Sequence, residues 1–343
     1  MKNKIRVAFI YKPSDVFLTG NHFDNTTYHF FMKALNRNKE IDVTYIKEEH
    51  TFDVSKIKNK IDVIIISGNH SMHTPSLEGI EKSNIPVISR TGDFHYAKRY
   101  NTFEFHKKFK INYYFNFMSG NYFYKFYPKN FEYKEIIFGI EPSLYKNIIP
   151  FNDRIKNKIL NSGAIGKETM VSRLANKILN PKRSGWYFYK LRTMCNRLSY
   201  VNHTGMIKEK YTNDDYPKLL SRYRATIAAT TFYPTLKYLE ATAAGCLTFM
   251  EITKKNNGEY LGFKDYETSV FINENNYKEK FLEFLNNPDN EMWAKIAEKG
   301  RKYTIENFNN DKAVESLVTL IKKIIWVKEY DNKNNNRWIY WKL

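Results

Sequence analysis

The chain has 343 residues, a length that predicts two domains, and 42% of them are hydrophobic. Its 26 tyrosines and 25 phenylalanines exclude a mainly disordered chain. Lys and Arg number 55 against 36 Asp and Glu, for a formal net charge of +19. Such a charge attracts DNA, RNA, anionic lipid or phosphorylated molecules, although a compositional bias toward lysine would also produce it.

Several classes of protein are excluded at this level. No apolar run approaches the roughly 18 residues of a membrane-spanning helix. The N-terminus lacks the apolar core of a signal peptide. Two cysteines, Cys195 and Cys246, are too few for a disulfide framework. We therefore expect a cytoplasmic protein, with peripheral contact with a membrane as an open alternative.

The first 120 residues alternate strand-sized apolar runs with segments of crossover length. We expect strands at residues 5–11, 42–46, 62–68, 85–89 and 113–117, and a helix that ends near residue 35. Nearly continuous apolar strands joined by crossovers indicate a parallel sheet covered on both faces. This pattern predicts a doubly wound α/β domain with ligands beyond the carboxyl ends of its strands.

A similar rhythm restarts near residue 155. We expect strands at residues 158–163, 225–229 and 246–250, and helices at residues 170–179, 216–223, 238–244, 277–285, 290–303 and 311–326. The Asn-rich residues 331–336 are expected to form a loop. The predicted domains are residues 1–150 and 151–326, followed by a tail, residues 327–343, that packs back on the first domain.

Common nucleotide and metal motifs are missing from the chain. No P-loop occurs, the first strand is not followed by a Gly-x-Gly turn, and there is no Gly-x-Ser-x-Gly elbow. No Asp-x-Asp pair is present to hold a metal–diphosphate complex. We therefore expect neither a metal site nor a cofactor.

Four segments, taken in order, resemble the group 1 superfamily of GT-B glycosyltransferases. They are residues 135–145, a strand ending in Gly-hydrophobic-acid; 159–167, a strand and Gly loop; 216–228, a helix and strand; and 233–246, a loop and a helix that ends Glu-Ala-x-Ala-x-Gly in that superfamily. The last segment looks closest to the spore-maturation-type branch. The resemblance implies two Rossmann-like domains that face a cleft, and transfer of a sugar from a nucleotide-diphosphate sugar to an acceptor hydroxyl without metal.

The donor is expected on the second domain. Thr235 and Leu236 form a turn into a helix whose free N–H groups suit a diphosphate, and Lys237 adds a cation there. Glu240, three residues on, is placed to accept hydrogen bonds from ribose hydroxyls. An alanine-rich core helix with a glycine C-cap is the alternative interpretation of this segment.

The resemblance adds further donor-site roles. Glu240 matches the second glutamate of the E-x7-E motif, whereas the first falls on Phe232. Gly163 belongs to the Gly loop, and Lys167 and Arg173 match the basic residues that hold the diphosphate.

The acceptor side is expected on the first domain. Asp93 and His95 follow the fourth strand, where a carboxylate or imidazole could act as a base toward an acceptor hydroxyl. A simple turn beside Gly92 is the alternative. The excess positive charge suggests a polyanionic acceptor, such as DNA, an anionic lipid-linked molecule or a surface glycan. Two alternative functions are a non-catalytic basic protein that binds nucleic acid and a glycosyltransferase that acts on DNA. The sequence does not indicate an oligomeric state.

Overall fold

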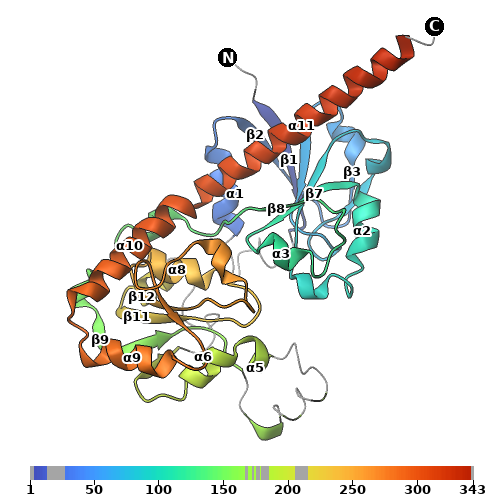
Figure 1. The fold of residues 1–343 in the computed structure, drawn as a ribbon. Helices are drawn as coiled ribbons and strands as arrows, with labels where there is room; N and C mark the ends of the chain where they lie inside the picture. The colour runs from blue at the N-terminus through green and yellow to red at the C-terminus, as the bar shows by residue number, and fades with distance from the viewer. Residues whose placement is uncertain are drawn as a thin grey trace. The chain divides into compact units, whose positions relative to one another are not determined.

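The computed structural model in Figure 1 describes residues 4–13, 28–166, 169–171, 174, 178, 185–204 and 215–340. The chain forms two compact units. Unit 1 comprises Met1–Phe138 with Asn310–Leu343, and unit 2 comprises Gly139–Asn309. The division therefore lies earlier in the chain than the expected boundary after residue 150.

Unit 1 holds a six-stranded sheet in the order β2-β1-β4-β6-β7-β8, in which all paired strands are parallel. Its strands are β1 Ile5–Tyr11, β2 Ile41–Lys47, β4 Val63–Ile66, β6 Val87–Arg90, β7 Ile111–Asn116 and β8 Tyr133–Glu135. The five strands expected in this region are confirmed. β2 and β4 lie on opposite sides of β1, so the strand order reverses between β1 and β4. A further parallel pair, β3 Thr51–Asp53 and β5 Ser76–Glu78, forms a separate ribbon.

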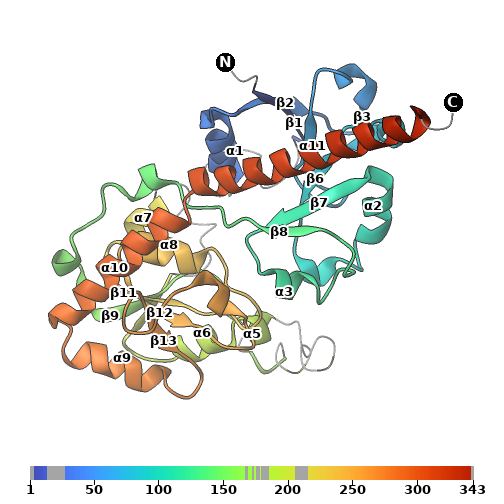
Figure 2. The same ribbon diagram turned by 45° about the horizontal axis from the view of Figure 1, so that its top comes forward.

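The C-terminal helix completes the core of unit 1. The helices of this unit are α1 Tyr28–Arg37, α2 Thr102–Phe109, α3 Gly120–Phe123 and α11 Asn310–Tyr340. Apolar residues of α11 recur every three or four positions, and Val314, Leu317 and Ile321 pack into one cluster with Phe9 and Phe31. α1 and α11 lie side by side in both views (Figures 1 and 2). The loop expected at residues 331–336 is wrong: α11 continues through it, because asparagine costs a helix far less than glycine or proline does.

Unit 2 holds a five-stranded parallel sheet in the order β10-β9-β11-β12-β13. Its strands are β9 Ile155–Asn161, β10 Val201–His203, β11 Tyr223–Ala228, β12 Leu247–Glu251 and β13 Val270–Ile272. The helices among its described residues are α5 Gly185–Phe188, α6 Lys190–Cys195, α7 Asp215–Leu220, α8 Lys237–Ala243, α9 Tyr277–Asn286 and α10 Glu291–Asn307. The strand order reverses between β9 and β11, the kind of position where doubly wound sheets bind ligands. Two parallel sheets with helices confirm the expected α/β fold class.

Within the part of the chain that the structure describes, no helix is both long and apolar enough to cross a membrane.

Replacement of Leu317 with alanine should destabilise unit 1 by about 2–5 kcal/mol, because this side chain is fully buried and its loss leaves a cavity. Chemical denaturation of the full chain measures the effect. Ser316→Ala on the exposed face of the same helix is the matched control and should change stability by less than about 0.5 kcal/mol. Equal effects of the two substitutions would show that α11 does not contribute to this core.

Candidate functional site

A buried lysine lies at the strand reversal of unit 2. Lys237 is the first residue of α8, and its side chain is only 9% exposed. Its ammonium group donates hydrogen bonds to Ser162 Oγ at 2.7 Å and to Tyr216 OH at 2.6 Å. Ser162 follows β9 and Tyr216 belongs to α7, so three separate segments meet at this nitrogen. The two hydroxyl groups are themselves 3.0 Å apart.

Burial shapes the charge of this site. Burial and, to a smaller extent, the nearby guanidinium of Arg192 lower the pKa of Lys237 to about 7, and the carboxylate of Glu240 acts in the opposite direction. Burial also raises the pKa of Glu240, and the charge of Lys237 opposes that shift. The ammonium group therefore sits in surroundings that compensate its charge only in part. An anion beside it would restore that balance and hold the proton on Lys237.

The loop after β9 is held in a fixed shape beneath Lys237. Gly163 has φ +82°, a conformation that favours glycine, and its carbonyl oxygen lies 2.9 Å from His203 Nε2. The buried Arg192 donates from Nε to Asn161 Oδ1 at 3.0 Å and from its terminal nitrogen to the carbonyl oxygen of Ser162. These contacts present Ser162 to the lysine in one orientation.

The passage that opens unit 2 also reaches this site. Gly139 has φ +123°, and a Cβ atom there would lie 2.9 Å from Leu236 Cδ2, so only glycine lets the chain pass so close to the start of α8. Tyr145 is buried, and the charge of Glu240 adds to the effect of burial in raising its pKa. All four segments that resemble group 1 enzymes therefore contribute residues around Lys237.

The expected donor residues divide into those that the structure places and those that it does not describe. Gly163, Leu236, Lys237 and Glu240 all lie around the carboxyl edge of β9 and β11, as described above. Thr235, immediately before them, accepts a hydrogen bond at its carbonyl oxygen from Tyr238 N–H at 3.1 Å. Lys167 and Arg173 lie outside the described residues. α8 has only seven residues, so Lys237 is a stronger argument for an anion than the helix itself.

Three residues of this site were not singled out from the sequence. Ser162 and Tyr216 lay inside the segments that carried the resemblance, but a serine and a tyrosine have no pattern that predicts a lysine partner. Nothing in the sequence around Arg192 predicts its role, because the local pattern does not distinguish a buried arginine from an exposed one.

Two further positions of unit 2 bear on the resemblance and on pH: Phe232 and Glu251. Phe232 packs against the rings of Tyr187 and Phe188, with centroids 5.4 and 5.9 Å away, so this position is aromatic rather than acidic. Glu251, the last residue of β12, is 7% exposed, and burial raises its pKa to about 8. Burial therefore favours the neutral form of the Glu251 side chain.

Asp93 and His95 lie together in unit 1. Asp93 caps a short 3-10 helix that begins at Phe94, and its Oδ1 lies 2.8 Å from His95 Nδ1. The other ring nitrogen, His95 Nε2, lies 2.5 Å from Tyr122 OH. Because both imidazole nitrogens are engaged, the exposed carboxylate of Asp93 is the better candidate for contact with a substrate, and His95 orients it.

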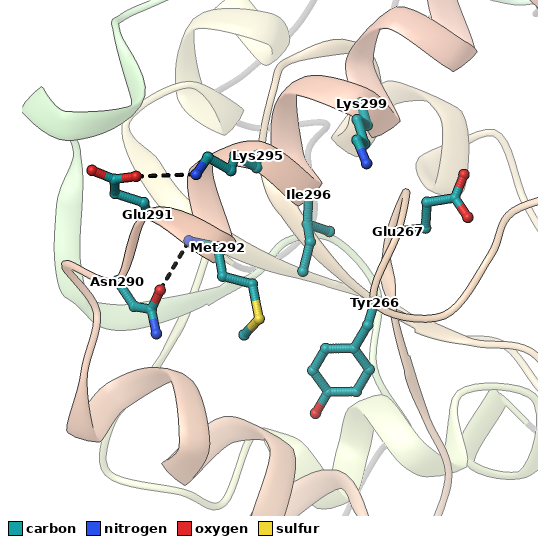
Figure 3. Close-up of a pocket in the computed structure, with 8 residues that line it drawn as sticks. All are labelled: Tyr266, Glu267, Asn290, Glu291, Met292, Lys295, Ile296 and Lys299. Atoms are coloured by element: carbon teal, nitrogen blue, oxygen red, sulfur yellow. Dashed lines mark hydrogen bonds and ion pairs between the residues drawn. The ribbon is translucent and has the colours of Figure 1, made fainter.

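A hollow of about 470 Å³ lies elsewhere in unit 2 (Figure 3). Its lining includes Tyr266 and Glu267, which precede β13, and residues of the first two turns of α10. Glu291 and Lys295 form an ion pair of 3.0 Å there. The hollow is thus at the amino edge of the sheet, opposite the edge that carries Lys237.

Comparison with known proteins connects this geometry to a class of enzyme. A family model described as "Glycosyl transferase-like" matches residues 175–319, which include Lys237 and Glu240. No curated protein sequence matches the chain. The family match and the fold confirm the expectation of a glycosyltransferase, and they do not favour a non-catalytic protein that binds nucleic acid.

Solved structures match almost the whole chain. A glycosyltransferase from Rickettsia africae matches with a TM-score of 0.58 and 11% identity, over 94% of this chain and 99% of the other. Sucrose-phosphate synthase from Thermosynechococcus elongatus matches with a TM-score of 0.58 and 12% identity, over 94% and 100%. An alpha-glucosyltransferase in complex with UDP-glucose and DNA containing an abasic site matches with a TM-score of 0.57 and 11% identity, over 93% and 100%. These structures confirm the GT-B fold. The family match over residues 175–319 supports the resemblance to the group 1 superfamily.

The pKa of Glu251 predicts how stability depends on pH. The unfolded chain releases this proton near pH 4.5, whereas the folded chain keeps it up to about pH 8. Between these values the folded state binds more protons, so this group lowers stability as pH rises, by at most about 1.4 kcal/mol per pH unit. Chemical denaturation of wild type and Glu251→Gln from pH 5 to 9 measures the effect. The free energy of unfolding of the variant should increase relative to that of wild type as pH rises. A constant difference would contradict the burial of this carboxyl group.

Proposed function

We propose that this protein transfers a sugar from a nucleotide-diphosphate sugar bound on unit 2 to an acceptor hydroxyl, without a metal ion. The observation that carries the proposal is the buried, partly compensated ammonium group of Lys237 at the strand reversal. A diphosphate is the leaving group of such a donor, and its two negative charges suit this group. The nearby guanidinium of Arg192 adds a second positive charge to the local field.

Each donor residue has a role in this proposal. Lys237 hydrogen-bonds and neutralises the diphosphate, which lowers the barrier to cleavage of the bond to the sugar. Gly163 lets the loop backbone approach the phosphates, as do Thr235 and Leu236 in the turn that precedes α8. Glu240 accepts hydrogen bonds from the ribose hydroxyls. Lys167 and Arg173 are proposed as further cations for the diphosphate, on the resemblance alone.

The acceptor hydroxyl is proposed to meet Asp93 in unit 1. The exposed carboxylate accepts the proton as the hydroxyl oxygen forms its bond to the sugar. His95 acts as a positioning residue, because its ring holds Asp93 on one side and Tyr122 on the other.

Two finer assignments belong to this proposal as well. The closest resemblance of residues 233–246 is to the spore-maturation-type branch, and we propose kinship with it on that segment. A cytoplasmic location is proposed from the scarcity of cysteine, since both cysteines are free and buried.

Binding of donor fragments tests the proposal. Lys237→Met should weaken binding of UDP-glucose, GDP-mannose or ADP-glucose, whichever binds, by about 1.5–3 kcal/mol, because a charged hydrogen bond to the diphosphate is lost. It should leave binding of the matching nucleoside nearly unchanged. Glu240→Gln should weaken both ligands alike, because both contain the ribose. Calorimetric titration measures these affinities.

The exposed Lys218→Met in the same unit is the control for the loss of a positive charge. If Lys237→Met lowers the affinity for the nucleotide sugar and for the nucleoside equally, Lys237 does not contact the phosphates.

Chelation tests the metal-free mechanism. Because Lys237 supplies the positive charge that a metal ion would otherwise bring to the diphosphate, sugar transfer or donor hydrolysis should proceed at the same rate in EDTA as without it. The release of nucleoside diphosphate is the measured quantity. A rate that is lost in EDTA and restored by Mg²⁺ or Mn²⁺ contradicts this mechanism.

A further inference from the structure

A groove lies between the C-terminal helix and the amino edge of the sheet in unit 1. It has a volume of about 580 Å³, and Lys323, Ile324 and Val327 of α11 form one wall. The other wall comes from residues that precede β6, β7 and β8 or begin β7: Ser83, Asn84, Ile85, Pro86, Lys110, Asn112, Tyr113 and Glu132. We call this hollow the α11 groove. It lies at the opposite edge of the sheet from Asp93 and is therefore distinct from the proposed acceptor position.

Large apolar side chains are exposed beside the groove. Trp326 is 64% exposed and Val327 is 42% exposed, whereas Ile321 and Ile324, just before them in α11, are buried in the core of unit 1. Tryptophan combines a large apolar ring with one N–H donor, which suits the boundary between lipid headgroups and acyl chains. The end of the buried stretch of α11 therefore favours a surface that is apolar on one side and wet on the other.

Two lysines of the groove form no ion pair in the described part of the chain. Lys323 Nζ donates a hydrogen bond to Tyr113 OH at 3.2 Å and lies 5.6 Å from the centroid of that ring. Lys110 Nζ donates to the carbonyl oxygen of Glu81 at 2.6 Å. Both lysines are exposed, so their charges are available to an anion.

The other charged groups near the groove leave the balance positive. Glu132 is the acidic residue among those that line it, and its charge acts on the lysine of α11 without forming an ion pair. Lys322 is paired with Glu40, and the charges of the exposed Glu81 and Lys82 cancel each other. The lining residues therefore carry two positive charges against one negative charge, which favours an anionic partner.

α11 continues this composition toward the end of the chain. The helix runs to Tyr340, and its last turns extend past the strands of unit 1 in both views (Figures 1 and 2). The sequence beyond Val327 holds Trp338 and Trp341, and the cations Lys328, Lys333, Arg337 and Lys342 against the acids Glu329 and Asp331. Basic helices with tryptophan are typical of segments that lie on anionic membranes.

We propose that the α11 groove docks unit 1 on an anionic phospholipid membrane. Lys110 and Lys323 contact the phosphates of the headgroups, while Trp326 and Val327 enter the region between headgroups and acyl chains. The aliphatic side chains of the groove favour a lipid over a nucleic acid, because Ile85 and Val327 offer no ring on which bases stack. The proposal does not depend on the proposed function, because every residue that carries it lies in unit 1, at the edge away from the acceptor position.

Sedimentation of the full chain with vesicles tests the proposal. Vesicles of equal parts phosphatidylglycerol and phosphatidylcholine should bind the protein at least about tenfold more tightly than vesicles of phosphatidylcholine alone, and added salt should weaken this binding. Trp326→Ala should weaken it about tenfold, whereas Trp326→Phe, which keeps an aromatic ring, should stay within about threefold. Lys323→Gln should weaken it about fivefold.

Met72→Ala and Lys47→Gln are the matched controls in the same unit. Met72 is 62% exposed and follows β4, and the exposed Lys47 ends β2, so both lie at the carboxyl edge of the sheet. Neither substitution should change vesicle binding by more than about twofold. An unchanged melting temperature shows that each variant is folded.

Three results would overturn the proposal. The first is that anionic vesicles do not bind the wild-type protein. The second is that the variants of Trp326 and Lys323 weaken vesicle binding no more than the two controls do. The third uses a DNA oligonucleotide as the probe: if DNA binds in place of vesicles and Trp326→Ala and Lys323→Gln both weaken that binding, the groove belongs to a nucleic acid.

Discussion

A single buried ammonium group organises the second unit of this protein. Removing a charge from water costs several kcal/mol unless hydrogen bonds and opposite charges replace the solvent. Lys237 has two hydroxyl partners and a nearby carboxyl group, but Arg192 raises the cost, and the pKa of the lysine falls to about 7 as a result. The surrounding structure supports this arrangement: Arg192 orients Ser162, Gly139 allows a close approach to α8, and α7 brings Tyr216. A folded protein that maintains such a charge gains most when an anion binds to it.

The sequence predicts those residues of the site that belong to one local pattern. Lys237 and Glu240 are recognisable because they lie on one turn of a helix that follows a strand and ends at a glycine. Their partners are not, because the contacts of Ser162 and Tyr216 with Lys237 span 75 and 21 residues of sequence. Only the packed sheet brings these residues together. The sequence also does not predict that both ring nitrogens of His95 have partners, since Tyr122 lies 27 residues away.

The same distinction holds for the fold. Long apolar strands such as β1 and β4 were expected because buried parallel strands are apolar throughout. The strands of three residues, β3, β5, β8, β10 and β13, were not, because three residues carry no periodicity. The membership of α11 in unit 1 depends on its packing against Phe9 and Phe31, at the other end of the chain. An amphipathic pattern shows that a helix has a partner without showing which one.

The two units use the same topology for opposite chemistry. Each parallel sheet reverses its strand order once, and each reversal carries the groups with which we associate a ligand. In unit 2 these groups are a buried cation and two hydroxyls, which favour a compact, highly charged ligand. In unit 1 they are the exposed carboxylate of Asp93 and the ring of His95 beside it, which suit a hydroxyl group. A reaction that moves a sugar from a diphosphate to a hydroxyl needs one site of each kind.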